Sequence, residues 1–261
     1  MSARILLIDI ETAPIEALVW QKSLYNTNVR VEQVEQDTHL FSYSAKWLDE
    51  KKIMYGDQSK RRDISNDTPL LWEIHTLLDE ADVVIAHNGQ AFDLPFVLTR
   101  MAGADIPPPS PFRQIDTYRV AKKQFGFTFN SLEFLGKALG CKIRKHEHKK
   151  FPGIQLWQEC KAGNNEAWKE MRIYNTDDTL LLEEVYMKLR PWIQGHPNLG
   201  LYVNDGDRHC PVCSSANLQI RKYIYTQTGL YRGYRCTDCG KYSRGRDVVN
   251  SKEHRKCQLI N

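Results

Sequence analysis

An apolar stretch near the start of the chain, RILLIDIETAP (residues 4–14), places two carboxylates where a core strand should be apolar. Every residue from Ile5 to Ile10 is aliphatic except Asp9, and Glu11 follows two positions later. Burying an unpaired carboxylate costs roughly several kcal/mol. Because residues i and i+2 of a strand face the same side, the two acids project together. The stretch therefore predicts a buried strand over residues 4–10 that ends in an acidic pair.

A bound cation would explain this pair. Two adjacent carboxylates repel each other unless a cation lies between them, and hard oxygen ligands suit Mg²⁺ or Mn²⁺. The carboxyl ends of strands are also where α/β sheets bind ligands. Acids at a strand end are often simply solvated, however, so a metal site needs further ligands elsewhere in the chain.

The composition is that of a globular protein without a membrane span. Of 261 residues, 41% are hydrophobic, and the mean hydropathy is −0.53. No apolar run approaches the roughly 18 residues that a membrane helix needs. The first apolar run meets acids at once and offers no small-residue cleavage site, which argues against a secretory signal. We expect a cytoplasmic protein with one large and one small domain.

Strand-like and helix-like stretches alternate over the first 190 residues. Residues 40–48 and 51–57 read as two strands that continue from the first in an antiparallel meander. Short apolar strands then alternate with amphipathic helices, and the last helix is the longest. These later elements are strands over 82–88 and 113–118 and helices over 68–81, 94–102, 130–140 and 164–189. The alternation predicts an α/β fold in which helices flank a mixed sheet.

A stretch rich in Gly, Pro, Asn and Asp, residues 195–207, follows the long helix. We therefore expect a domain over residues 1–195, a linker over 196–207 and a small domain over 208–261. The charge divides in a similar way, because residues 201–261 hold 11 Lys and Arg against 5 Asp and Glu. A basic tail favours a polyanionic partner, most simply nucleic acid, although a solvated basic surface is the alternative.

Two later stretches add further acids. AHNGQAFDLPFV (residues 86–97) puts Asp93 at the entry of a helix, and the long helix carries Tyr174 and Asp178 on one face. Each has a plainer explanation, because Asp93 can complement its helix dipole and the Tyr174/Asp178 pair can lie on the surface. Asp116, at another strand end, could support the acidic site from behind its ligands, but a helix cap is the better explanation.

DIET, HNGQAFD and YNTDD, in this order, resemble the three motifs of the DnaQ-like (DEDD) 3′–5′ exonucleases, which have an RNase H-like fold. In the third motif, the tyrosine type has Tyr four residues before the last Asp, and the histidine type has His five before it. Tyr174 is four residues before Asp178, and Ile173 is five before it. If Asp177 were the last Asp of the motif, Ile173 would lie four residues before it and Arg172 five before it, which fits neither type. The resemblance therefore implies the tyrosine type, with Asp178 as the ligand.

The resemblance also implies a site for two divalent ions, Mg²⁺ or Mn²⁺. The implied ligands are Asp9, Glu11, Asp93 and Asp178. Two such ions, about 3.5–4 Å apart, stabilise the entering and leaving oxygens of a phosphodiester displacement. Tyr174 would orient the attacking water or the phosphate, because a phenol with a pKa of about 10 is a poor base at neutral pH. Contacts to the terminal nucleotide are expected from Thr12, Asn88 and Phe92, with core packing as the alternative for Phe92.

Four of the seven cysteines form two knuckles, CPVC and CTDC, separated by 22 residues. These cysteines are Cys210, Cys213, Cys236 and Cys239. Four thiolates at this spacing predict one tetrahedral structural Zn²⁺ and resemble a zinc ribbon. Two disulfides are the alternative, which a cytoplasmic location disfavours. Zinc would also stabilise a segment too short for a large apolar core.

Tyr and Arg or Lys interleave around the second knuckle, and residues 201–261 hold six of the twelve tyrosines. Cations can follow phosphates while aromatic rings stack on bases. We therefore expect nucleic-acid contacts from Tyr231, Arg232 and Arg235. The alternative is that the tyrosines form the small core of the ribbon, and zinc ribbons also bind proteins.

The resulting hypothesis is a stand-alone 3′–5′ exonuclease that releases nucleoside monophosphates from single-stranded DNA. The motifs followed by a ribbon resemble small phage exonucleases, which would place the protein in a bacterial cytoplasm or, if phage-encoded, in that of the host. Replication or repair proteins would then be partners in trans. A 3′–5′ exoribonuclease and a non-catalytic nucleic-acid-binding protein are the alternatives. The oligomeric state is left open.

Overall fold

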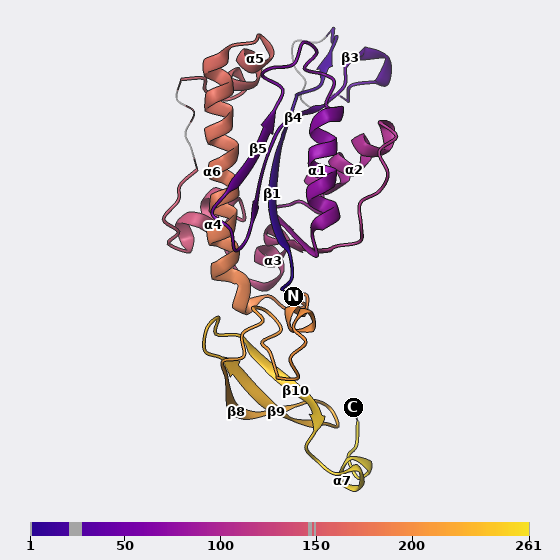
Figure 1. Ribbon diagram of the computed structural model, residues 1–261, viewed down its shortest axis with the longest axis vertical. Helices are drawn as coiled ribbons and strands as arrows, with labels where there is room; N and C mark the ends of the chain where they lie inside the picture. The colour runs from indigo at the N-terminus through magenta and orange to yellow at the C-terminus, as the bar shows by residue number, and fades with distance from the viewer. Residues whose placement is uncertain (1, 21–27, 146–147, 149, 261) are drawn as a thin grey trace. The chain divides into compact units, whose positions relative to one another are not determined.

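The computed structural model describes residues 2–20, 28–145, 148 and 150–260 (Figure 1). The chain divides into a larger unit, Arg4–Val185, and a smaller unit, Met1–Ala3 with Tyr186–Asn261. The division expected near residue 195 stays a prediction. None of the helices in the described ranges has the length and apolar character needed to cross a membrane.

A five-stranded mixed sheet in the order β5-β4-β1-β6-β7 forms the centre of the larger unit. β4 is antiparallel to β1 and β5, whereas β6 is parallel to β1 and β7. The strands are β1 (Ile5–Thr12), β4 (Leu40–Trp47), β5 (Ile53–Asp57), β6 (Val83–Ala86) and β7 (Arg113–Asp116). A separate pair, β2 (Glu16–Ala17) and β3 (Val34–Gln36), was not expected. The predicted meander and mixed sheet are confirmed.

Helices cover both faces of this sheet (Figure 1). α1 and α2 lie on one side, and the long helix α6 lies on the other. The helices are α1 (Thr68–Glu80), α2 (Asp93–Gly103), α3 (Thr117–Gln124), α4 (Leu132–Ala138), α5 (Gln155–Lys161) and α6 (Asn165–Leu189). Sequence patterns predicted α1, α2, α4 and α6 but not α3 and α5, which have eight and seven residues. A helix of about two turns shows little periodicity, and α4, equally short, was recognised from its apolar spacing.

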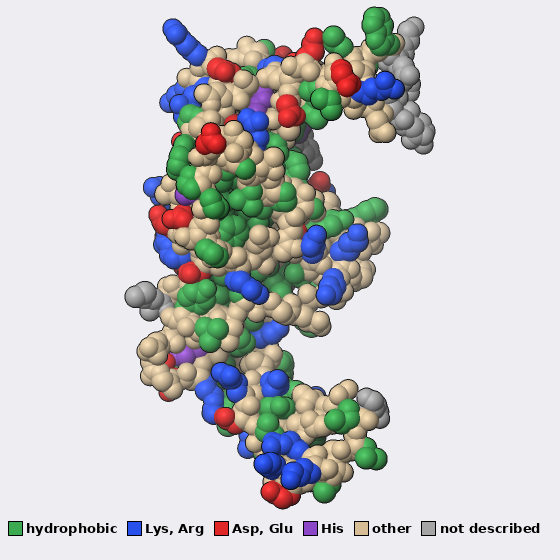
Figure 2. All heavy atoms as spheres, turned by 90° about the vertical axis from the view of Figure 1, so that its right-hand side faces the viewer, with side chains coloured by type: hydrophobic (Ala, Val, Ile, Leu, Met, Phe, Trp, Pro, Cys, Tyr) green, Lys and Arg blue, Asp and Glu red, His purple; other side chains and the backbone are tan. Residues whose placement is uncertain are grey.

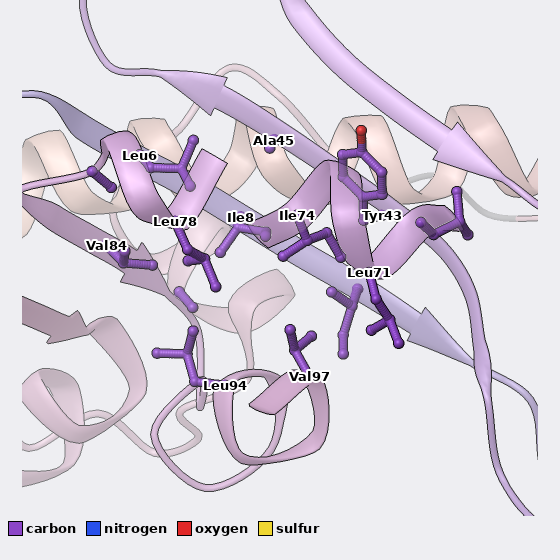
Figure 3. Close-up of a cluster of buried hydrophobic side chains, with 14 of the residues drawn as sticks. Leu6, Ile8, Tyr43, Ala45, Leu71, Ile74, Leu78, Val84, Leu94 and Val97 are labelled. Carbon is purple, nitrogen blue, oxygen red and sulfur yellow. The ribbon is translucent and has the colours of Figure 1, made fainter. Parts of the chain in front are cut away.

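The face toward α1 and α2 is apolar (Figure 3). Leu6, Ile8 and Ile10 alternate along β1 and pack against this core, in which Ile74 and Leu78 of α1 are fully buried. Since successive side chains of a strand point to opposite faces, Asp9 and Glu11 point the other way, toward α6. The even-numbered side chains of β1 therefore pack beneath α1 and α2, whereas its odd-numbered side chains face α6, where the buried Ile5 and Leu7 precede Asp9 and Glu11.

The face toward α6 has a polar layer. Ser42 Oγ of β4 donates a hydrogen bond to Asn175 Oδ1 at 3.1 Å, and Lys46 Nζ lies 2.6 Å from Glu183 Oε1. Apolar residues pack beyond this layer, where Phe41 meets Trp168 with ring centres 5.2 Å apart. Both kinds of contact hold α6 against the sheet.

The smaller unit contains a three-stranded antiparallel sheet in the order β10-β9-β8. Its strands are β8 (Leu218–Tyr225), β9 (Leu230–Cys236) and β10 (Tyr242–Val248), and the helix α7 (Lys252–Lys256) follows. Short 3₁₀ turns precede the sheet at Arg190–Trp192 and Leu199–Tyr202, and one lies at Val31–Gln33 in the larger unit. The buried residues beside this sheet are mainly cysteines, with Val212 and Leu218 packed among them.

Replacing Ile74 with Ala should lower the free energy of unfolding of the larger unit by about 2–5 kcal/mol, because the lost side chain leaves a cavity in a closed core. Urea denaturation followed by circular dichroism measures this change. Thr76→Ala, at an exposed position of the same helix, should alter stability by less than about 0.5 kcal/mol. Equal losses in the two variants would contradict the assigned core.

Candidate functional site

β1 presents Asp9 and Glu11 side by side on the face that meets α6. Their cross-strand partners in β4 are the buried Ser44 and the buried Ser42, and the register shifts just after Glu11. Ile10, between the two acids, packs into the core of the opposite face. The strand therefore fixes the backbone positions of both acids.

Asn175 of α6 holds Asp9 in place. Its Nδ2 donates to Asp9 Oδ2 at 2.7 Å and to the Asp9 carbonyl at 3.3 Å, while its Oδ1 accepts the bond from Ser42. Asn175 is fully buried. We did not single out Asn175 from the sequence; its place on the buried face of α6, three residues before Asp178, was the available signal.

α6 also brings Asp178 to the acids of β1. Asp9, Glu11 and Asp178 each offer a carboxylate oxygen, and these oxygens all lie within 4.8 Å of one another. Lys145 Nζ lies 2.8 Å from Asp178 Oδ2 and 4.5 Å from the centre of the Tyr174 ring. Lys145 belongs to the basic run KIRKHEHKK (residues 142–150), whose composition alone fits either a solvated loop or a phosphate contact. His146, Glu147 and Lys149 of that run lie outside the described residues.

Asp93 lies beside this group of three carboxylates rather than within it. It is buried in the first turn of α2, and its Oδ1 accepts the backbone N–H of Ile10 at 3.3 Å. Asp116 supports the preceding turn, because its carboxylate accepts the N–H groups of Asn88 at 3.0 Å and Gln90 at 3.2 Å. It also caps α3, which confirms the predicted cap. Asn88 has a φ of 65°, a conformation that Asn tolerates better than most residues.

Crowding and burial shift the protonation of these groups. Burial and then the neighbouring charges of Asp93, Glu11 and Asp178 raise the pKa of Asp9. Burial and the charge of Asp178 raise the pKa of Glu11 to about 8, and burial raises that of Asp93 to about 7. For Lys145, burial lowers the pKa, but the carboxylate of Asp178 and then Tyr174 outweigh it, so the pKa is raised. The cluster therefore favours any cation that can neutralise it.

The donor set fits a hard divalent cation. Three carboxylates converge, and the Oδ1 atom of Asp178 is buried without a hydrogen-bond partner. Unpaired buried carboxylate oxygens are costly, and Mg²⁺ and Mn²⁺ bind such oxygens. The residues present therefore suit a divalent metal, which would relieve both the repulsion and the missing contact.

The larger unit is similar in sequence to a known protein family and in structure to a solved protein. Residues 31–190 match the RNase_H superfamily, a range that includes Asp93, Tyr174 and Asp178 and begins after Asp9 and Glu11. The chain belongs to the RNase H superfamily. A solved structure of a family B DNA polymerase from the hyperthermophilic archaeon Pyrobaculum calidifontis is similar, with 14% identity and a TM-score of 0.50. The similarity covers 73% of this chain but only 25% of the polymerase, so it supports the RNase H-like fold alone. The comparison with curated proteins finds no match.

Of the nucleotide contacts expected in this RNase H-superfamily unit, Phe92 is the most exposed. Its side chain is 44% exposed and stacks on Phe96, with ring centres 6.1 Å apart. Both rings line a cleft of about 620 Å³ between α2 and the segments 37–38 and 66–68, whose wall includes the ion pair of Arg100 with Asp67. This exposure argues against the core-packing alternative for Phe92. Thr12, at the end of β1, is half-buried.

The four predicted zinc cysteines come together in the smaller unit. The Sγ atoms of Cys210, Cys213, Cys236 and Cys239 all lie within 4.8 Å of one another. Cys210 and Cys239 are 3.5 Å apart, and Cys213 and Cys236 are 3.6 Å apart. Disulfide sulfurs lie about 2.0 Å apart, whereas Zn–S bonds of about 2.3 Å in a tetrahedron separate sulfurs by about 3.8 Å. All four cysteines are free thiols, so the set is compatible with a zinc ribbon.

Hydrogen bonds to one of these thiols favour its ionised form. Burial opposes ionisation of Cys236, but hydrogen bonds from the backbone N–H groups of Cys239 and Asp238, together with those from the thiols of Cys213 and Cys239, outweigh it and lower its pKa to about 7. A thiolate is the form that binds a metal. The three expected nucleic-acid contacts of β9 are divided between its faces, because Tyr231 and Arg235 share one face and Arg232 lies on the other.

Without divalent ions, the chain should lose stability as pH rises from about 4.5 to about 8. Glu11 has a pKa of about 4.5 when unfolded and about 8 when folded, so in this window the folded state holds a proton that the unfolded state has released. The loss is at most about 1.4 kcal/mol per pH unit for one such group. Thermal denaturation across this pH range measures it.

The control for this pH effect is Glu11→Gln, which removes the titrating carboxylate. The variant should melt at a higher temperature than the unaltered chain at pH 8 without divalent ions, and Mg²⁺ should stabilise it less. An unchanged pH dependence in Glu11→Gln would contradict the assigned crowding.

Cys236→Ser should abolish the binding of one equivalent of Zn²⁺, because three thiolates no longer close the tetrahedral site. Metal content after gel filtration, measured by atomic emission, tests this. Cys257→Ser is the matched control, since Cys257 is an exposed thiol outside the cluster and should leave one equivalent bound. Full zinc binding in Cys236→Ser would disprove the ligand set.

Proposed function

We propose that this chain is a metal-dependent 3′–5′ exonuclease of the DEDD tyrosine type that releases nucleoside monophosphates. The observation that carries the proposal is the convergence of Asp9 and Glu11 from β1 with Asp178 from α6. Tyr174 lies one turn before Asp178, and membership in the RNase H superfamily supports a nuclease in general. The substrate we propose is the 3′ end of single-stranded DNA, on the resemblance of the motifs and ribbon to small phage exonucleases.

The residues that would hold two divalent ions are Asp9, Glu11, Asp93 and Asp178. Such ions, Mg²⁺ or Mn²⁺, supply Lewis acidity that activates water and neutralises phosphate charge. The chain keeps these oxygens in place before any ion binds. Asn175 orients Asp9, and the N–H of Ile10 orients Asp93. Such preorganisation limits the rearrangement needed when substrate arrives.

Tyr174 would act as a hydrogen-bond donor in this reaction. Burial, and next the charge of Glu11, raise the pKa of Tyr174 to about 12, so the phenol keeps its proton at neutral pH. Its ring is held by edge contacts with His148 at 5.2 Å and Trp157 at 6.0 Å between ring centres. A fixed, protonated phenol can orient a water molecule or a phosphate oxygen, but it cannot serve as the base.

Lys145 would balance charge at the same place. In the protein without cations, its ammonium pairs with Asp178 at 2.8 Å and lies over the Tyr174 ring. A divalent ion on Asp178 would repel this ammonium, and the nearest new anion would be the phosphate of a bound substrate. Lys145 is therefore proposed as a phosphate contact, one of the two interpretations that the basic run allowed.

Digestion of oligonucleotides labelled at either end tests the proposal. With Mg²⁺ or Mn²⁺, a 5′-labelled single strand should shorten stepwise, and a 3′-labelled one should release a labelled mononucleotide at once. Asp178→Asn should lower the rate at least about 10³-fold, since several kcal/mol of transition-state stabilisation depend on the ligand set. Asp177→Asn is the matched control, because the adjacent acid is outside the group of converging carboxylates, and it should stay active.

Each outcome of the digestion has a defined meaning. Shortening from the 5′ end would overturn the proposed polarity, and loss of activity in Asp177→Asn but not in Asp178→Asn would overturn the ligand assignment. Matched RNA strands identify an exoribonuclease if they are degraded faster than DNA. A folded, zinc-loaded chain without activity in Mn²⁺ would indicate a protein that only binds nucleic acid.

A further inference from the structure

The two faces of the sheet in the smaller unit differ in chemistry. Residues directly opposite each other on neighbouring antiparallel strands share a face. Leu218 and Cys236 form such a pair and pack among the metal-binding cysteines. The opposite face, called here the outer face, carries Arg221, Tyr231, Arg235, Tyr242 and Arg244. It therefore points away from the cysteine core.

Arginines lie over the tyrosine rings of the outer face. The guanidinium carbon of Arg244 is 4.1 Å from the centre of the Tyr231 ring, and that of Arg235 is 5.8 Å from the centre of the Tyr242 ring. A guanidinium held over an aromatic face keeps N–H donors at its edge for a further partner. The rings thus fix the positions of the cations, and a base could not stack on the sides of the rings that the guanidinium groups cover.

The outer face is strongly positive. Arg221 and Arg244 lie on either side of Gly233 in the ladder, and Gly233 puts no side chain between them. Among the described residues of the ribbon strands and knuckles, the acids are engaged elsewhere: Asp238 accepts bonds from Ser215 and Asn217, and Asp247 pairs with Arg208. Figure 2 shows Lys and Arg side chains gathered on the surface of this unit.

We propose that the outer face binds the sugar-phosphate backbone of a single-stranded nucleic acid, with the tyrosines orienting arginines instead of stacking on bases. The three guanidinium groups come from three adjacent strands, and adjacent strands lie about 4.8 Å apart. Cations arranged in this way suit the repeating phosphates of a nucleic-acid strand. The face presents guanidinium donors, which suit phosphate oxygens, and no carboxylate that would repel them; the side-chain oxygen of Gln219 on the same face already accepts a bond from Arg221. The inference rests on the proposed function, for which the face would hold the strand independently of sequence.

The test compares two ligands on the full chain carrying Asp9→Asn, so that the strand is not degraded. Fluorescence anisotropy measures binding of an oligo-dT strand and of an equally long strand of abasic sites, between 50 and 300 mM salt. Because Phe92 of the larger unit can contact a base, the readout is the factor by which a variant of the outer face weakens each strand, and this factor should agree within about twofold between the two strands. Adding Arg235→Ala and Arg244→Ala should weaken both at least about tenfold and reduce the salt slope by about 1.4, which is two phosphate contacts.

Variants of the tyrosines separate the two modes of binding. Tyr231→Leu removes the ring beneath Arg244 and should weaken dT and abasic strands equally, whereas Tyr231→Phe should change neither. A loss confined to the dT strand would show base stacking and overturn the inference. Unchanged binding in the double arginine variant would also overturn the inference. That result is expected if the outer face binds a protein instead of nucleic acid. Zinc content and the melting temperature must match those of the unaltered chain.

Hydrolysis of a one-nucleotide substrate tests the proposed function separately from binding at the outer face. The nitrophenyl ester of thymidine 5′-monophosphate is a one-nucleotide substrate that does not extend along a binding face. The arginine variants with Asp9 intact should hydrolyse it at the unaltered rate, while Asp9→Asn should not. If the unaltered chain hydrolyses neither this ester nor any strand, the proposed exonuclease fails, and the binding measurements still decide the role of the outer face.

Discussion

The rest of the larger unit depends on the alternation of β1, which packs Leu6, Ile8 and Ile10 into the core on one face of the sheet and brings Asp9 and Glu11, after Ile5 and Leu7, to the other. The aliphatic face anchors the central strand beneath α1 and α2. That anchoring leaves Asp9 and Glu11 with little freedom to move apart, although their charges repel each other. Two groups reduce the cost of this repulsion: Asn175 of α6 donates a hydrogen bond to Asp9, and Lys145 pairs with Asp178.

The contact between β1 and α6 shows how the acids are tolerated. Asn175 satisfies Asp9 with a fully buried amide, which itself accepts a bond from Ser42. Buried polar groups stabilise a fold only when their partners are complete, so this network positions the helix as well as the acid. Asp178 keeps one buried oxygen without a partner, and this incomplete site is where a cation would contribute most.

The smaller unit has a small core built around four cysteines. Its apolar residues are too few for a large core, and four converging thiols occupy the place where aliphatic side chains would pack in a larger domain. Because one face of its sheet meets these thiols at Leu218 and Cys236, the opposite face is free to carry the exposed Arg221, Arg235 and Arg244. The outer face is thus a consequence of the position of the metal-binding core.

The sequence by itself determined the mixed α/β sheet, the position of the acid pair on β1, the Tyr174/Asp178 spacing and the two cysteine knuckles. These features depend on local periodicity or on short spacings. The tertiary structure alone decided which distant groups meet: Asn175 with Asp9, Lys145 with Asp178, and Asp116 with the turn before Asp93. The strand period also separates Arg232 from Tyr231, but only the cross-strand register shows that each tyrosine of the outer face lies beneath an arginine. Such contacts join residues far apart in the chain, and no local pattern specifies them.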